Sequence, residues 1–181
     1  MNLKAEILLK HSQEQMRRIV EYVGADEGRF AELMRLFLSG EYRIVQRSSW
    51  AVSKAVERHP TLIVPYFKQI LALLEDEDAH ASVHRNILRL LQTAPIPKRL
   101  EARIFDICLD RIDDETQSTA VRAFAIEVAG RIAAGEPELL AEIRLVTERH
   151  LAGSRAAIKA KARNVLKMDT GARPDIFFRE T

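Results

Sequence analysis

The spacing of three prolines most constrains what this chain can fold into. Pro60, Pro97 and Pro137 follow one another at intervals of 37 and 40 residues, and each opens a segment whose apolar residues recur at helical spacing. Proline suits the first turn of a helix, where its missing N–H needs no partner. The spacing therefore indicates a repeated unit of about 38 residues that begins with a helix.

Arginines give a second, independent register. Arg47, Arg85, Arg122 and Arg163 lie 38, 37 and 41 residues apart, at matching places in the second half of each unit. The residues after Arg85 and Arg163 are also alike, Asn-Ile-Leu and Asn-Val-Leu. Both registers predict the same two-helix unit, used four times.

Helix start and stop signals fill in these units. Ser12 with Gln15 has the capping-box pattern and opens a helix that ends at Gly24, while Asp26 opens the next, which ends at Gly40. Apolar residues recur at three-to-four spacing, and no segment alternates with period two, so we expect helices and no strand. The predicted helices are 12–24, 26–40, 41–59, 60–75, 79–93, 97–112, 115–134, 137–151 and 154–168.

An acidic residue precedes the repeated arginine by six or seven positions in three units: Glu41, Asp78 and Glu115. The fourth unit has Ala156 there. This pattern resembles the HEAT and armadillo-like helical repeat superfamily. The resemblance covers residues 26–168 and implies an all-α fold, an α-α superhelix in which four hairpins stack as a short right-handed solenoid after an N-terminal helix.

Residues Trp50–Val52 and Val83–Leu91 further resemble a group of small, uncharacterised bacterial HEAT-like proteins. We expect a single helical-repeat domain over 1–181. Its parts are the N-terminal helical segment 1–24, the hairpins 26–168, and a tail, 169–181, that covers the end of the stack or binds a second copy.

The sequence also suggests where the protein works. It has neither the apolar core of a signal peptide nor a run of about 18 uncharged apolar residues. The single cysteine, Cys108, lies in an apolar run and has no second thiol to pair with. We therefore expect a protein of the reducing cytoplasm that does not enter a membrane.

No catalytic motif is visible. None of the 7 glycines belongs to a phosphate-binding pattern. The best candidates for metal ligands are His80 and His84, which lie four residues apart and follow Asp76 and Asp78. Such a pair, without a third histidine or a cysteine nearby, usually lies on the surface and binds no metal. We predict no catalytic residue, no cofactor and no metal, although an active site assembled from distant repeats would leave no motif.

Charge distinguishes the predicted second helices. The ranges 41–59, 79–93, 116–134 and 154–168 carry a net charge of about +10, and the rest of the chain about −8, within a total of +2. In a HEAT-like stack the second helices line the concave face. The resemblance thus implies a basic groove in an almost neutral protein.

One helix sharpens this prediction. At about 100° per residue, Arg43, Arg47, Trp50, Lys54 and Arg58 fall within an arc of about 80°. An indole among cations suits cation–π contacts, base stacking or a partner's side chain. The last helix adds cations at every fourth residue, from Arg155 to Lys167. The candidate binding residues are Arg43, Arg47, Trp50, Lys54, Arg85, Arg89, Arg122, Lys159 and Arg163.

Three interpretations are open. The first is a non-enzymatic interaction module that binds an acidic segment of a protein partner on this basic face. The second is nucleic-acid binding resembling that of HEAT-like DNA alkylation-repair proteins, without glycosylase activity, because only one Trp and no evident catalytic carboxylate are present. The third is an enzyme with a metal centre at His80 and His84. Against all three stands a purely structural explanation, in which the arginines pair with the turn acids and a neighbouring repeat covers Trp50.

Overall fold

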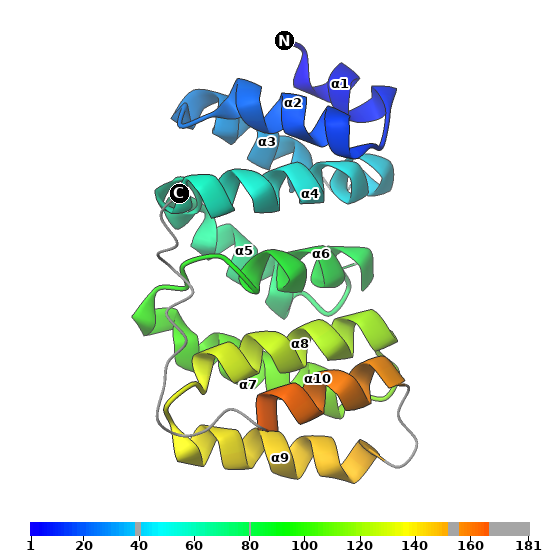
Figure 1. Cartoon of the computed structure of the whole chain (residues 1–181), viewed down its shortest axis with the longest axis vertical. Helices are drawn as coiled ribbons and strands as arrows, with labels where there is room; N and C mark the ends of the chain where they lie inside the picture. Colours follow the sequence, from blue (N-terminus) through cyan, green and yellow to red (C-terminus); the bar gives the residue numbers. More distant parts are fainter. Residues whose placement is uncertain (39–40, 80, 152–155, 167–181) are drawn as a thin grey trace. The chain divides into compact units, whose positions relative to one another are not determined.

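The computed structural model describes residues 1–38, 41–79, 81–151 and 156–166. All regular secondary structure in these ranges is helical (Figure 1). The chain divides into two compact units, Met1–Lys98 and Arg99–Thr181, which we call unit 1 and unit 2. The all-α fold predicted from the repeat is confirmed.

The described part of unit 1 contains a run of α-helices interrupted by one 3-10 helix. Its elements are α1 (Leu3–Leu9), α2 (Gln13–Val23), α3 (Glu27–Phe37), α4 (Tyr42–Arg58), η1 (Pro60–Tyr66), α5 (Phe67–Glu75) and α6 (Ala81–Leu91). The described part of unit 2 continues with α7 (Lys98–Asp113), α8 (Thr119–Ile132), α9 (Pro137–Leu151) and α10 (Ala156–Leu166).

The predicted helix caps are present where the structure describes them. Ser12 Oγ accepts a hydrogen bond from the backbone N–H of Gln15 at 3.2 Å, and Asp26 Oδ1 accepts one from Arg29 N–H at 2.9 Å. Gly24 ends α2 with a φ of 50°, which favours glycine. The predicted stop at Gly40 and the tail 169–181 lie outside the described residues.

Two elements differ from the sequence prediction. The segment after Pro60 begins as the 3-10 helix η1, and α5 begins only at Phe67. Pro65 accounts for this, because its ring would clash with the carbonyl four residues earlier in an α-helix. The segment 1–24 holds two helices, since α1 precedes α2 and begins at the cap formed by Asn2, whose Oδ1 accepts the N–H of Ala5.

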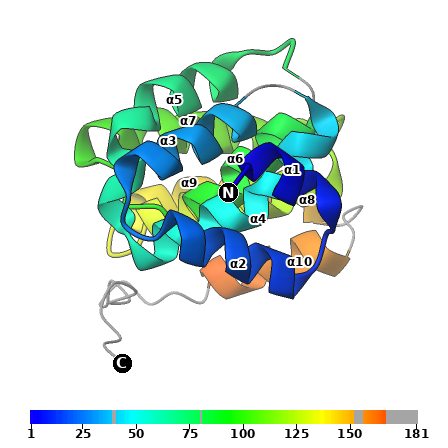
Figure 2. The ribbon, with the colours of Figure 1, turned by 90° about the horizontal axis from the view of Figure 1, so that it is seen from above.

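Helix α4 is the centre of unit 1. It packs against α1, α2, α3, η1 and α6, and Figure 2 shows α3 and α5 on one side of it and α2 on the other. Close packing on several sides requires small side chains, and the buried serines Ser48, Ser49 and Ser53 serve this purpose. Their hydroxyls donate to carbonyls of the preceding turn, so none of these buried hydroxyls lacks a hydrogen-bond partner.

In unit 2, α8 packs against α9 and α10, and α9 and α10 also pack against each other. The approach of α10 depends on a residue without a side chain. A Cβ atom at Gly130 of α8 would lie 2.5 Å from Cγ2 of Val165 in α10. Real Cβ atoms do not approach other atoms so closely, so any larger residue at this position would displace the side chain of Val165.

Candidate functional site

The exposed side of α4 carries the residues that the helical angle predicted. Most α4 positions are buried, and those that remain accessible are Tyr42, Arg43, Gln46, Arg47, Trp50, Lys54, Glu57 and Arg58. Arg43 and Arg58 are exposed, whereas Arg47, Trp50 and Lys54 are half-buried. Lys54 Nζ lies 2.5 Å from the carboxylate of Glu57.

Trp50 is neither fully covered nor fully open. Its ring lies beside the imidazole of His11, which precedes α2, with ring centroids 6.2 Å apart and a tilt of 54°. His11 is itself exposed. The indole is thus supported by its own unit and still reaches solvent.

Arg47 has a structural role that the sequence did not reveal. Its Nη1 donates to the carbonyl oxygen of Leu8 at 2.6 Å. Leu8 lies in the last turn of α1, where helical carbonyls have no partner within the helix. The turn acid that precedes Arg47, Glu41, lies instead 3.5 Å from Lys4.

Other side chains bond carbonyls near the ends of preceding helices in the same way. Arg29 Nη1 donates to Tyr22 O at 2.7 Å, and Gln15 Nε2 donates to Glu6 O at 2.9 Å. His84 Nε2 lies 3.0 Å from Asp76 O, just after α5. These bonds join consecutive helices through their unsatisfied carbonyls.

Helix α6, which packs against α4, supplies the next pair of predicted residues. Arg89 is exposed and Arg85 is half-buried. No acidic residue occurs between Ala81 and Leu91. The described part of unit 1 thus brings α4 and α6 together, and it carries Arg43, Arg47, Trp50, Lys54, Arg85 and Arg89.

The remaining predicted residues belong to unit 2. Arg122 is only 7% exposed, and its Nε donates to Ile112 O at 3.0 Å, so it supports the end of α7. In α10, Lys159 is half-buried and Arg163 is exposed, with Arg163 Nε donating to Lys159 O at 3.1 Å. Arg155 and Lys167, from the same predicted row, lie outside the described residues.

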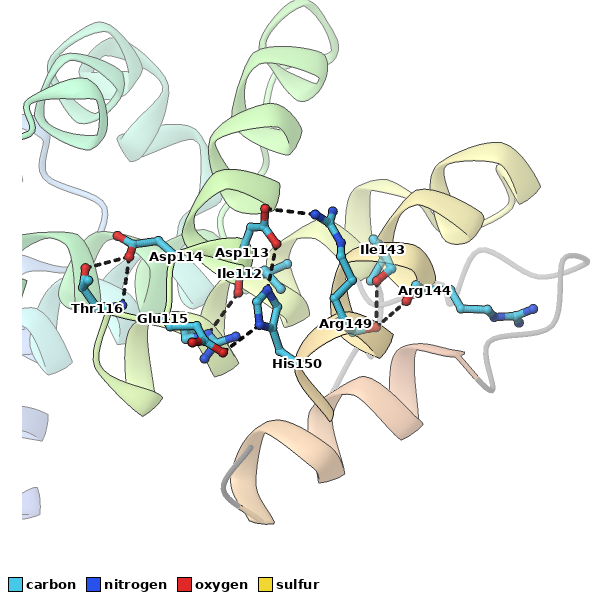
Figure 3. A network of polar contacts seen from close by, with 11 residues as sticks. Ile112, Asp113, Asp114, Glu115, Thr116, Ile143, Arg144, Arg149 and His150 are labelled. Carbon is cyan, nitrogen blue, oxygen red and sulfur yellow. Dashed lines mark hydrogen bonds and ion pairs between the residues drawn. The ribbon is translucent and has the colours of Figure 1, made fainter. Parts of the chain in front are cut away.

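A charged network in unit 2 was missed by the sequence analysis. Figure 3 shows His150 of α9 between the carboxylate of Asp113, the last residue of α7, and that of Glu115 in the turn that follows. His150 Nε2 lies 2.8 Å from Asp113 Oδ1, and Nδ1 lies 2.9 Å from Glu115 Oε1. Arg149 Nη1 lies 3.3 Å from the other oxygen of Asp113. Both ring nitrogens donate at once only when the imidazole is protonated.

The network also sets the charge of its acids. The hydrogen bond from His150 lowers the pKa of Asp113, assisted by the nearby charges of Arg149 and Arg122. Hydrogen bonds from Thr116 and Gln117 lower the pKa of Asp114. Both carboxylates are therefore ionised at neutral pH. Asp113 joins the end of α7 to the end of α9, whereas Asp114 bonds only within its own turn.

The metal and thiol candidates have ordinary environments. Among the described residues no group of three or more His, Cys, Asp or Glu side chains could hold a metal ion; His80 lies outside them. His84 is buried against the backbone of Asp76. Cys108 is fully buried in the core, and this burial raises the pKa of its thiol to about 12.

Within the described residues, every helix is too short or too polar to span a bilayer. The sequence matches the family model of the HEAT repeat domain over residues 3–168. No curated protein and no solved structure matches it significantly. The match begins at the first residue of α1 and extends past the last residue of α10, so it covers all of the helices described above. The chain therefore belongs to the HEAT repeat domain family.

Proposed function

We propose that this HEAT repeat module binds an acidic segment of a protein partner on the exposed sides of α4 and α6. We call this the α4–α6 surface and define it by Arg43, Trp50, Lys54, Arg85 and Arg89. Arg47 lies between Arg43 and Trp50 in α4 but is left out of the definition because it donates to Leu8 O. The buried Arg122 is left out, and Lys159 and Arg163 form a separate basic patch on α10.

The observation that carries the proposal is the charge of two helices in contact. Glu57 is the only acid within α4 and α6, and Lys54 neutralises it. Against Glu57, α4 and α6 together carry the cations Arg43, Arg47, Lys54, Arg58, Arg85 and Arg89. A surface of one sign attracts a partner of the opposite sign and speeds its association.

Charge alone would give weak binding, and this makes Trp50 important. An exposed ion pair contributes about 0.2–1 kcal/mol, whereas an aromatic anchor at an interface contributes about 2 kcal/mol or more. Trp50 is half-buried, supported by His11 and adjacent to the cations. We therefore propose that an apolar side chain of the acidic segment packs on this indole.

A photo-crosslinking experiment tests the proposal. A photoreactive phenylalanine analogue replaces Gln46, an exposed residue of α4, and the cross-linked peptide is identified by mass spectrometry after exposure to a native lysate. We expect a peptide rich in Asp and Glu. The double variant Arg43→Glu/Arg89→Glu should abolish the cross-link.

The control has the same change in net charge at another place. Arg99→Glu/Arg144→Glu reverses two exposed arginines of unit 2 and should leave the cross-link intact. An equal loss in both double variants, or a cross-linked peptide without net negative charge, would contradict the proposal.

Nucleic-acid binding is the second candidate, favoured by the accessible indole among cations. Bases stack on such side chains, and single strands bind with a steep salt dependence. Because Trp50 is the only tryptophan, a 20-nucleotide single-stranded DNA that used the α4–α6 surface should quench the protein's fluorescence. Absence of quenching at about 20 mM salt would exclude this candidate, since weak phosphate contacts are strongest there.

We also propose that the protein binds its partner in the reducing cytoplasm. The only cysteine, Cys108, is buried and has no second thiol in the chain. Nothing in its surroundings therefore requires an oxidising compartment.

A further inference from the structure

A groove lies in unit 1 between α3 on one side and η1 and α5 on the other, and none of its lining residues belongs to the α4–α6 surface. It consists of two cavities, of about 670 Å³ and 380 Å³, which share Ala31 and Tyr66 in their walls. Leu38, which directly follows α3, and Ala72 and Leu73 of α5 line the larger one. Figure 2 shows α3 and α5 on the same side of α4. We call this space the α3–α5 groove; its volume suits several apolar side chains.

The lining allows close approach. Ala31 and Ala72 are exposed and small, so another backbone can come near both helices. Between them the ring of Tyr66 packs edge-on against Phe30, with centroids 5.7 Å apart. The hydroxyl of Tyr66, like that of any tyrosine at neutral pH, is protonated and can donate a hydrogen bond, and burial and the charge of Glu27 raise its pKa further.

The two ends of the groove have opposite charge. Glu27, in the first turn of α3, lines the smaller cavity, and Arg35, in its last turn, lines the larger one. Eight residues of helix separate them by about 12 Å. In the part of the chain that the structure describes, neither residue forms a salt bridge.

The chemistry of the walls selects the form of a bound segment. The groove is bounded by helices, whose backbone groups are bonded within each helix and cannot pair with an extended peptide. An extended occupant would bury N–H and C=O groups without partners, whereas a helix satisfies its own. The apolar lining therefore favours a helix with one apolar face.

The charges select its direction. Acidic residues are favourable at the start of a helix and basic residues at its end. A helix that runs antiparallel to α3 brings its acidic start to Arg35 and its basic end to Glu27. We propose that the α3–α5 groove binds an amphipathic helix of a partner protein in this orientation, with an acid and a base about two turns apart beside its apolar face. This is a second binding surface, which shares no residue with the α4–α6 surface.

A displayed library of 16-residue peptides tests the inference. The peptides have apolar residues fixed at helical spacing and all other positions varied, and the full chain is the target. We expect enrichment of helices with an acid in the first turn and a base about eight residues later. In calorimetric titrations, Ala31→Trp and Ala72→Trp should each weaken the best peptide at least tenfold, because the indole fills the groove.

Two controls separate binding from folding. Ala141→Trp alters an exposed alanine of α9 and should leave the affinity unchanged. Arg35→Glu should weaken the peptide, and exchanging the peptide's first-turn acid for Lys should restore binding. Such a rescue cannot arise from a misfolded variant.

Four results would overturn the inference. The first is a library without enriched peptides, and the second is peptides that bind Ala31→Trp as well as they bind the parent chain. The third is a synthetic peptide of residues 170–181 that displaces the selected helix, which would make the chain's own end the occupant. The fourth is a dimer of the chain that Ala31→Trp dissociates, which would make a second copy of the chain the occupant of the groove.

Discussion

The repeated arginines show how one residue type can serve the backbone at some positions and remain accessible at others. Arg47 and Arg122 each bond a carbonyl of the helix that ends beside them, while Arg163 is exposed. Sequence spacing places all of them in equivalent positions. The number of bonds that each can still offer a partner depends on the carbonyls around it.

Removing one such bond gives a stability prediction. Arg47→Met keeps the length of the side chain but leaves Leu8 O without its donor. We expect the free energy of unfolding to fall by about 1.5–3 kcal/mol, as for other hydrogen bonds that involve a charged group. Urea denaturation followed by circular dichroism measures the change. Arg43→Met, at an exposed position of the same helix, should change it by less than about 0.5 kcal/mol; equal losses would contradict the assigned role.

Asp113 gives a prediction that depends on pH. Its pKa is lowered in the folded protein by His150 and by the neighbouring arginines. The carboxylate therefore stabilises the fold at pH values above its unfolded pKa of about 3.9, and this contribution disappears as the pH falls through the lower folded pKa. Asp113→Asn should lower the melting temperature at pH 5.5, and the difference from the parent chain should shrink below pH 4. A difference that is constant or grows toward low pH would show that the charge is not responsible.

The sequence could predict only part of the candidate site. The accessible arc of α4 follows from helical geometry, because burial on one side leaves Arg43, Trp50 and Lys54 on the other. The partners of His150 lie 35 and 37 residues earlier in the chain, and only the packing of α9 beside the turn after α7 brings them together. The acceptor of Arg47 is a main-chain oxygen, which no residue type marks.

At the level of helices, an element was predictable where its caps and the spacing of its apolar residues could be recognised in the sequence. Caps at Ser12 and Asp26 and the apolar stripe of α3 all agree with each other, and these helices are where they were expected. Helix α1 was missed because only Leu3 and Ile7 are buried in it, too few for a visible period. At η1 the apolar pattern suggested an α-helix, but the backbone restriction of Pro65 prevailed.

The contact between α8 and α10 gives the prediction for this scale. Gly130→Ala places a methyl group against Val165 and should lower the free energy of unfolding by about 1–3 kcal/mol through overpacking. Thermal unfolding measures it. Val165→Ala should recover part of the loss in the double variant, because it removes the atoms that clash. Simple addition of the two single losses would contradict a direct contact.

At the scale of the whole molecule, the sequence predicts a single domain over residues 1–181. This prediction has a thermodynamic test, because Trp50 reports only on unit 1. In a cooperative repeat array, a destabilised repeat lowers the stability of its neighbours. If the chain unfolds as one domain, Gly130→Ala should shift the Trp50 fluorescence transition and the circular dichroism transition to the same new midpoint. A fluorescence transition that stays in place while the other moves would show that the units unfold separately.

The side-chain bonds to helix ends also have a direction along the chain. Gln15, Arg29, Arg47, His84 and Arg122 each bond a carbonyl that precedes them, by 7 to 39 residues. A chain leaves the ribosome from its N-terminus at about 5–20 residues per second. Each of these carbonyls is therefore synthesised at most several seconds before the side chain that donates a hydrogen bond to it. The order in which this protein is synthesised is also the order in which its helices can be joined.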